Sequence, residues 1–216
     1  MSHEPMFNLR EKAPLVLFGV LTLVHIIKVI APNKVLAIIT PWVLLTPISN
    51  EAYSIQHNMI SLLGHGFFHS DFMHLITNGF MMIAFGVVTL VGLRAKSHVR
   101  GFSPVQKFYL IFILGVIGGG IFQWGWWSIT NITASSALGA SGGAAALFAT
   151  MAYALGGKER LVKYGLGWFV GNIAIALIGP SVGMHIAWAA HIGGYALGMI
   201  IAPYWVKPKS TSFRLN

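Results

Sequence analysis

A single serine stands in a stretch of small and apolar residues, "ALGASGGAAALFA", at residues 137–149. This residue, Ser141, lies between Gly139 and Gly142–Gly143 and opens a long apolar segment. A serine hydroxyl attacks a carbonyl carbon effectively only when a neighbouring base removes its proton. A second apolar stretch, "AHIGGYALG", contains one such base, His191. A serine and a histidine in these settings suggest nucleophilic acyl transfer.

Two more polar side chains could serve the same reaction. His74 and Asn78 lie four residues apart in "HLITN", so on a helix they share one face. Both can donate hydrogen bonds to an oxygen that becomes negative during acyl transfer. If Ser141 begins a helix, its free backbone N–H and the helix dipole favour the same charge. We therefore expect an oxyanion site formed by His74, Asn78 and the N–H of Ser141.

The composition places these side chains in a membrane. Of 216 residues, 56% are hydrophobic and only 9% are charged, which is far less charge than a soluble domain carries. The chain has no cysteine, which excludes disulfides and thiolate–metal sites. The formal net charge is +9, but the position of the basic residues makes it a signal of membrane orientation rather than of nucleic-acid binding.

Six continuous apolar runs predict membrane-spanning helices, because barrel strands would alternate in polarity. A helical span needs about 20 apolar residues. The predicted fold class is therefore an all-α membrane protein with a six-helix bundle at 13–206, flanked by cytoplasmic segments at 1–12 and 207–216. The expected spans are Ala13–Ile30, Phe72–Leu93, Phe108–Trp127, Ser141–Leu155, Leu161–Ile178 and Met184–Val206.

The segment between the first two spans, Ala31–Asp71, is semi-apolar and contains three prolines. Because proline interrupts helices, we expect a long structured loop in the membrane interface rather than a straight span. His65 and His69 fall in this segment. We expect these two histidines to be structural and to tie the loop to the bundle.

The basic residues predict the orientation of the bundle, because Lys and Arg gather on the cytoplasmic side. Of the 14 Lys and Arg residues, all but Lys28 and Lys34 fall on the side that holds both chain ends. Both termini are therefore expected in the cytoplasm. The basic residues on that side are Arg10, Lys12, Arg94, Lys96, Arg100, Lys107, Lys158, Arg160, Lys163, Lys207, Lys209 and Arg214.

Three polar residues are expected at one depth. The segment Ser141–Leu155 covers only about 22 Å of a hydrocarbon core about 30 Å thick, and two glycines with Lys158 fix its cytoplasmic end. Ser141 then lies about 8 Å below the outer surface, with Asn78 and His191 about 9 to 10 Å below it. A loop reaches such depth only where it lines a wet cavity or is buried in protein. We predict an outward-facing pocket with Ser141 at its floor.

Small residues predict how His191 reaches Ser141. Gly194 and Gly198 follow His191 on roughly one helix face, and the segment after Ser141 is similarly small. Small faces let two membrane helices approach closely. The glycines expected to serve this packing are Gly139, Gly142, Gly194 and Gly198.

The motifs together resemble those of the rhomboid family of intramembrane serine proteases. "GASG" at Gly139–Gly142 is similar to the family's nucleophile motif, "AHIGGYALG" at Ala190–Gly198 to its AHxxGxxxG motif, and "HLITN" at His74–Asn78 to its HxxxN element. The resemblance covers nearly the whole chain. It implies the minimal six-span form of a bacterial inner membrane. It also implies a Ser141–His191 dyad without a third acidic residue or a cofactor, acting on membrane-spanning proteins near the outer face.

Some positions depart from the family's pattern. A Trp-Arg pair frequent in the family is replaced by Ile60–Ser61, and a common glutamate is replaced by Leu90. We interpret these changes as a matched loss, because an unpaired buried charge is costly. The tyrosine that packs against the family's catalytic base is replaced by Ala145. Trp188 and Tyr195 are the candidates to take its place.

Each polar residue also has a structural interpretation. Ser141 is a favoured type of helix N-cap. His191 could be a buried histidine bonded to a backbone carbonyl, and His74 and Asn78 could join helices by hydrogen bonds. Asn172, a lone polar group in an apolar run, is assigned no role.

Two other functions stay open. One is a membrane metalloenzyme that uses His65, His69 and His74 with His185 or His191, since HxxxH spacing on a helix directs two imidazoles to one face. Against it, the cluster has no carboxylate inside the membrane. The other is a catalytically weak or inactive rhomboid-like protein that binds membrane proteins. Against that, inactive relatives usually lose the serine or the histidine, and this chain keeps both.

Overall fold

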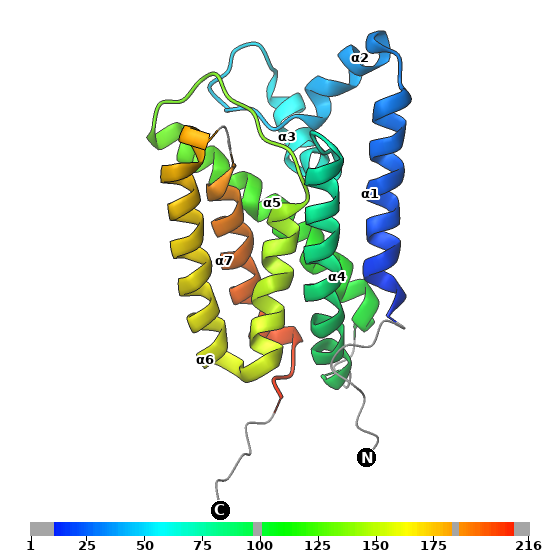
Figure 1. Ribbon diagram of the computed structural model, residues 1–216, viewed down its shortest axis with the longest axis vertical. Coiled ribbons are helices and arrows are strands. Elements are labelled where there is room, and N and C mark those ends of the chain that lie inside the picture. The colour runs from blue at the N-terminus through cyan, green and yellow to red at the C-terminus, as the bar shows by residue number, and fades with distance from the viewer. Residues whose placement is uncertain (1–10, 97–100, 183–185, 210–216) are drawn as a thin grey trace, which may run out of the picture.

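A computed structural model describes residues 11–96, 101–182 and 186–209 of the chain. Within these ranges the regular secondary structure is helical, which confirms the expected helical class. Figure 1 shows the long helices packed roughly side by side, with the short ones gathered at one end. The elements are α1 (Lys12–Ile30), α2 (Asn33–Val43), α3 (Ile55–Gly64), the 3₁₀ turn η1 (His65–Phe67), α4 (Phe72–Ala95), α5 (Pro104–Ile129), α6 (Ser141–Ile178), the 3₁₀ turn η2 (Gly179–Val182) and α7 (Trp188–Trp205).

Four helices of the described part, α1, α4, α5 and α6, are long and apolar enough to cross a membrane. The helix faces that point away from the bundle expose large apolar side chains such as Leu23, Phe80 and Ile129. Water would not favour so much exposed apolar surface, whereas the hydrocarbon of a bilayer does not penalise it.

Helix α6 contains a sharp break at Gly156 and Gly157. Gly157 has φ +64°, a conformation that glycine adopts without the steric cost of a side chain. Figure 1 shows the consequence, because the two halves of α6 run next to each other in opposite directions. The two expected apolar segments, Ser141–Leu155 and Leu161–Ile178, fall in the two halves.

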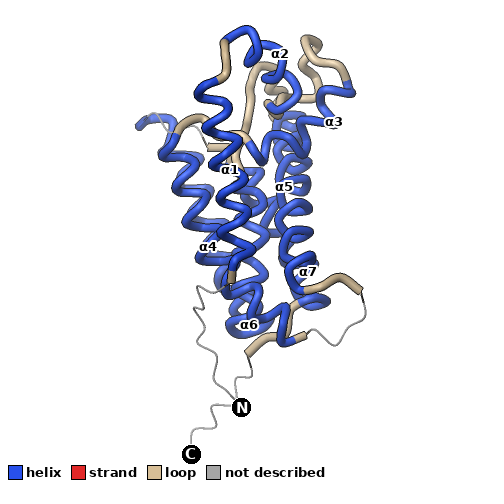
Figure 2. The backbone as a smooth tube through the Cα atoms, turned by 90° about the vertical axis from the view of Figure 1, so that its right-hand side faces the viewer, coloured by secondary structure: helices blue, strands red, loops and turns tan. Residues whose placement is uncertain are grey.

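The expected loop at 31–71 contains the short helices α2 and α3 and the turn η1. Figures 1 and 2 both place α2 and α3 at the end of the bundle where α4 begins. Leu45, just after α2, exchanges two backbone hydrogen bonds with Ala137, at 3.0 and 2.8 Å. This segment is therefore attached directly to the loop that leads into α6.

Helix boundaries differ from the apolar runs where polar caps extend the helices. Helix α5 begins at Pro104 rather than at Phe108, because Ser103 and Gln106 form a reciprocal capping box with proline at the first turn. The described part of α7 begins at Trp188. The expected start of the last span, Met184, lies outside the described residues.

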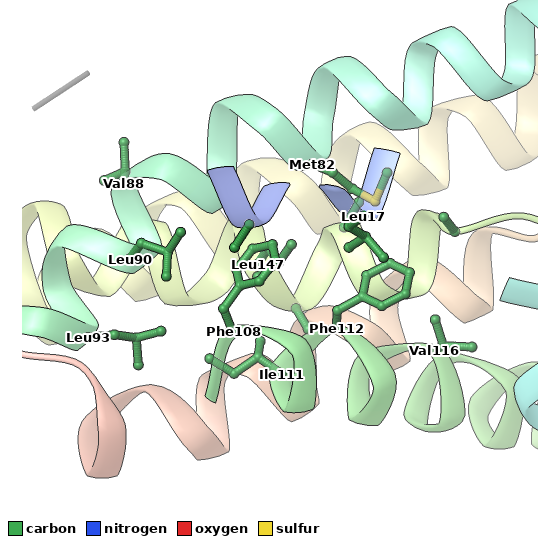
Figure 3. Close-up of a cluster of buried hydrophobic side chains, with 14 of the residues drawn as sticks. Leu17, Met82, Val88, Leu90, Leu93, Phe108, Ile111, Phe112, Val116 and Leu147 are labelled. Carbon is green, nitrogen blue, oxygen red and sulfur yellow. The ribbon is translucent and has the colours of Figure 1, made fainter. Parts of the chain in front are cut away.

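The buried core joins four of the long helices. Figure 3 shows Leu17 of α1, Met82 and Leu90 of α4, Phe112 of α5 and Leu147 of α6 among the clustered side chains. Leu90 has no exposed surface, so an apolar side chain fits this position well. The cluster holds α1, α4, α5 and the first half of α6 as one packed unit.

The opposite end of the bundle is held by polar contacts. Arg94, near the end of α4, forms an ion pair with Glu11 at 2.7 Å. The backbone N–H groups of Lys207 and Lys209 donate to the carbonyls of Gly92 and Ala154 at 3.0 and 2.8 Å. The start of α1, the end of α4, the break in α6 and the end of α7 therefore lie together.

Candidate active site

Ser141 is the first residue of α6, and its hydroxyl is directed at α7. Ser141 Oγ lies 2.8 Å from Nε2 of His191, a residue in the first turn of α7. Ala140 occupies the N-cap position and makes no side-chain cap hydrogen bond. The interpretation of Ser141 as the N-cap is therefore wrong, because its hydroxyl meets a ring nitrogen instead of the backbone of its own helix.

The second ring nitrogen of His191 also meets a side chain. His191 Nδ1 lies 2.7 Å from Oδ1 of Asn172, in the second half of α6. Both ring nitrogens thus face side chains rather than backbone carbonyls. Asn172 is buried, with 4% of its surface exposed. Sequence reasoning assigned it no role, although a lone amide in an apolar run is a recognisable signal of a polar partner inside the membrane.

An aromatic residue completes the surroundings of His191. The Trp168 ring centroid lies 5.9 Å from that of His191, and Trp168 Nε1 donates to the carbonyl of His191 at 3.2 Å. The expected candidates for this position were Trp188 and Tyr195. Trp188 instead packs edge-on against Trp126, and Tyr195 stacks on Trp168.

Glycines allow the close contact between α6 and α7. A Cβ atom at Gly194 would overlap the carbonyl of Gly142, and one at Gly198 would meet the carbonyl of Ala146 at 2.5 Å. The two backbones are thus too close for larger side chains at these positions. This spacing lets His191 reach Ser141.

Gly139 does not have the helix-packing role that was expected of it. It lies in the loop before α6, with φ +122°. A Cβ atom there would sit 2.7 Å from the His74 ring. Its backbone N–H donates to the carbonyl of His65 at 2.8 Å. Gly139 therefore positions the loop against His74 rather than one helix against another.

The rings of His65 and His69 both contact the backbone. His65 contacts α3, and His69 contacts the residue just before α6. The Nδ1–H of His65 faces the carbonyl of Ser61 at 2.9 Å, and the N–H of Ala140 donates to His69 Nε2 at 3.4 Å. Burial lowers the pKa of His65 to about 4 and that of His69 to about 3. Both rings are therefore neutral near pH 7.

The structure gives the metal hypothesis little support. His65 lies in η1 and His69 in the extended segment after it, so the expectation that HxxxH spacing places both on one helix face is wrong. Among the residues that the structure describes, no group of three or more histidine, aspartate or glutamate side chains is arranged to hold a metal ion. His185 lies outside these residues.

His74 and Asn78 lie in the first turns of α4, which Asp71 caps. Asp71 accepts a hydrogen bond from the backbone N–H of His74 at 2.9 Å and one from the hydroxyl of Ser70 at 2.6 Å. The hydrogen bond from Ser70 is the main reason that the pKa of Asp71 is lowered. Ser70 Oγ also lies 3.1 Å from His74 Nδ1, which leaves Nε2 of His74 on the side of Gly139.

Asn78 offers one free amide hydrogen. Its Nδ2 donates to the carbonyl of His74 at 3.1 Å, and a side-chain amide carries two hydrogens. The Oδ1 of Asn78 is buried and has no hydrogen-bond partner among the described residues. Among the residues described, the hydrogen bonds of His74 and Asn78 thus lie within 70–78 and do not join α4 to another helix.

All four polar residues line one cavity of about 600 Å³. Ser141 and His191 come from α6 and α7, and His74 and Asn78 come from α4. Figure 1 shows that α6 begins further from the α2 end of the bundle than α4 does. The rest of the wall combines apolar residues such as Met73, Met81 and Leu138 with polar ones, Ser70, Asp71, Thr77 and Ser136.

The fold and the site define an integral membrane protein that is helical over its described residues, with a serine–histidine pair in a cavity lined by both polar and apolar side chains. The family model of the Rhomboid domain matches residues 56–208, and the chain belongs to the rhomboid family. This confirms the resemblance drawn from the motifs. Members of the family are generally serine intramembrane proteases that act on membrane proteins. No curated protein matches the chain.

Proposed function

We propose that this protein is an intramembrane serine endopeptidase that cleaves membrane-spanning proteins near the outer face of the membrane. The observation that carries the proposal is the 2.8 Å contact between Ser141 Oγ and His191 Nε2. This contact lies inside a cavity that also holds two potential hydrogen-bond donors. A nucleophile, its base and groups that can stabilise a developing charge are the requirements for acyl transfer.

The reaction follows from these positions. His191 Nε2 takes the proton of Ser141 as Oγ attacks a peptide carbonyl, and the resulting imidazolium gives that proton to the leaving amine. Water then enters the cavity, loses a proton to His191 and attacks the acyl carbonyl. As the acyl group leaves as a carboxylic acid, His191 returns that proton to Ser141 Oγ. The enzyme thereby returns to its starting state without a metal or a cofactor.

The negative oxygen of the tetrahedral intermediate needs hydrogen-bond donors. The backbone N–H of Ser141 is free because it belongs to the first turn of α6. The remaining amide hydrogen of Asn78 and an Nε2–H of His74 are the other two donors in this proposal. This tautomer requires the hydroxyl hydrogen of Ser70 to turn from Asp71 to His74 Nδ1, because a hydroxyl donates only one hydrogen bond.

The other predicted residues have positioning roles in this proposal. His65 and His69 hold the segment before α4 to the loop that leads into Ser141. Gly142, Gly194 and Gly198 let α7 approach α6. These contacts together keep Ser141 and His191 within hydrogen-bond distance of each other.

The orientation is part of the proposal. Helices α1, α4, α5, the two halves of α6, and α7 would make six crossings, with both termini in the cytoplasm. Arg94, Lys207 and Lys209 lie at the end of the bundle where α1 begins and α7 ends, and basic residues favour the cytoplasmic side. The cavity then opens to the outer side of a membrane that we infer to be a bacterial inner membrane.

The substrate follows from the same geometry. A helix in a membrane uses its carbonyls in its own hydrogen bonds, so a spanning substrate must unwind before Ser141 can attack it. We therefore propose substrates whose spans contain helix-breaking residues near their outer ends. Resemblance to the family adds a preference for cleavage beside a small residue.

Cleavage of a reporter tests this function. The wild type, Ser141→Ala and His191→Ala would each be co-expressed with a tagged single-span protein that carries a helix-breaking stretch near its outer face. The proposal predicts cleavage by the wild type alone at equal expression. If a folded wild type leaves a panel of such reporters intact but retains them on affinity purification, the protein is a binder and the proposal is wrong.

A further inference from the structure

We propose that Asn172 is a positioning residue that fixes the tautomer and the orientation of His191, forming a Ser141–His191–Asn172 triad. The proposal rests on the proposed function, since it assigns the third member of the same site. Three connected hydrogen bonds in the structure support the proposal. These are Asn172 to the carbonyl of Trp168, Asn172 to Nδ1 of His191, and Nε2 of His191 to Ser141.

The first contact determines which end of the amide faces the ring. Asn172 Nδ2 lies 2.8 Å from the backbone carbonyl of Trp168. A carbonyl only accepts hydrogen bonds, so the NH₂ group of Asn172 must lie on this side. The opposite end, Oδ1, then faces His191 at 2.7 Å.

The amide oxygen in turn determines the tautomer of the ring. Oδ1 only accepts hydrogen bonds, so His191 Nδ1 must carry the hydrogen. In the neutral ring Nε2 is then bare, and it can only accept a hydrogen from Ser141. A bare Nε2 facing the hydroxyl is the state that a general base requires before attack.

The same contacts hold the ring in place after it takes the proton. Nδ1 keeps its hydrogen bond to Oδ1 when Nε2 becomes protonated, so the imidazolium faces an oxygen that carries partial negative charge. Trp168 adds a hydrogen bond from its indole to the backbone of His191 at 3.2 Å. The second half of α6 is thereby joined to the first turn of α7 at two points.

An amide suits this position better than a carboxylate would. Asn172 is 4% exposed, and a charged side chain at such a depth in a membrane carries a large desolvation cost. A neutral oxygen orients the ring without that cost. Residue 145 is alanine, so no tyrosine ring packs against His191 from there. Trp168 takes part of that place, and its ring centroid lies 5.9 Å from that of His191.

Nuclear magnetic resonance of ¹⁵N-histidine-labelled full-length protein in detergent micelles tests the proposal without using catalysis. Protonated and bare ring nitrogens have distinct ¹⁵N shifts, and the signals of His191 are those missing from His191→Ala. The wild type should show a protonated Nδ1 and a bare Nε2. Asn172→Leu, which keeps the volume but removes the acceptor, should lose this pattern in favour of a mixture of tautomers.

A matched control separates positioning from general support of α7. Gln123 of α5 is also a buried amide and accepts a hydrogen bond from the backbone N–H of Ala190 in α7 at 3.2 Å, whereas the hydrogen bonds described for the His191 ring go to Asn172 and Ser141. Gln123→Leu should therefore leave the tautomer of His191 unchanged. An unchanged tautomer in Asn172→Leu, or the same loss in both variants, would overturn the proposal.

Kinetics supply the second readout. Asn172→Leu should lower kcat by roughly 10-fold or more with little change in KM, because the wrong tautomer cannot accept the proton of Ser141. Asn172→Asp, which keeps an oxygen acceptor, should lose less of kcat than Asn172→Leu, but its melting temperature should fall because its carboxylate carries the desolvation cost. If the tautomer depends on Asn172 but no serine reacts in the wild type, the proposed protease function fails and the positioning of the ring stands.

Discussion

Gly194 of α7 lies directly against the carbonyl of Gly142 in α6, with no space for a methyl group between them. Gly142 is the residue next to Ser141, and Gly194 lies almost one helical turn beyond His191. The separation of the two backbones at this contact therefore sets the separation of the two proposed catalytic side chains.

A methyl group at Gly194 should disrupt the site. Gly194→Ala should push α7 away from α6 and reduce kcat/KM by at least about 10-fold, which corresponds to about 1.4 kcal/mol of lost transition-state stabilisation. The melting temperature should also fall. Cleavage kinetics and thermal unfolding in detergent measure both effects.

Gly125→Ala is the matched control, because nothing lies within 4 Å of a Cβ atom at Gly125 in α5. This variant should keep its activity and its melting temperature. Equal activities of Gly194→Ala and the wild type would show that the contact with Gly142 does not set the geometry of the site.

Gly139 should matter for the position of His74. Gly139→Ala places a methyl group 2.7 Å from the His74 ring, so it should displace a proposed oxyanion donor and lower kcat by about 10-fold or more. Gly101 has a similar φ of +127°, but a Cβ atom there meets nothing within 4 Å. Gly101→Ala should therefore show backbone strain without loss of kcat. Comparable kcat values for the two variants would contradict the proposed role of the loop.

The two side-chain donors should act mainly on the transition state. Asn78→Ala and His74→Ala should each lower kcat by about 10²-fold with little change in KM, as expected for oxyanion donors. The measurement is the steady-state cleavage of a reporter by purified protein, with melting temperatures recorded in parallel. A change confined to KM would instead assign these residues to substrate binding.

Acid should destabilise the protein through His65 and His69. Burial lowers the pKa of His65 to about 4 and that of His69 to about 3, whereas a histidine in the unfolded chain has a pKa of about 6.5. Below pH 6.5 the unfolded chain binds protons that the folded chain does not, so stability falls as the pH drops towards 4. Above pH 6.5 neither the folded nor the unfolded chain protonates these two rings, so this loss of stability is absent.

Thermal unfolding between about pH 7.5 and pH 4.5 measures this loss. His69→Gln keeps an acceptor for the N–H of Ala140 but cannot titrate, so its melting temperature should fall less across this range than that of the wild type. A wild type whose melting temperature does not change between these pH values would show that neither ring is held neutral by the fold.

The sequence was sufficient for the positions of α1 and α4. Continuous apolar runs locate α1 and α4 to within two residues of their observed ends, because burial in hydrocarbon requires such runs. Polar caps were the source of error at α5, where the helix starts ahead of the apolar run. The short helices α2 and α3 were not predicted, because their sequences lack the length of a span.

The relation between residues on different helices was harder to predict. Asn172 and Trp168 come from a helix that is apolar nearly all round, and such a helix has no polar face from which its rotation can be read. The lone amide of Asn172 indicates a polar partner, but the sequence does not indicate that this partner is His191 or that Trp168 lies beside it. The motifs around Ser141 and His191 were informative because small residues mark the faces at which helices meet.

The most direct test of the central claim is covalent labelling of Ser141 by a fluorophosphonate, which reacts with serines that a base has activated. Membranes containing the wild type, Ser141→Ala or His191→Ala would be treated with the probe, and the modified peptide would be identified by mass spectrometry. The account predicts one labelled peptide, containing Ser141, in the wild type and none in either variant. Absence of label from folded wild type, or equal labelling of Ser141 in His191→Ala, would contradict it.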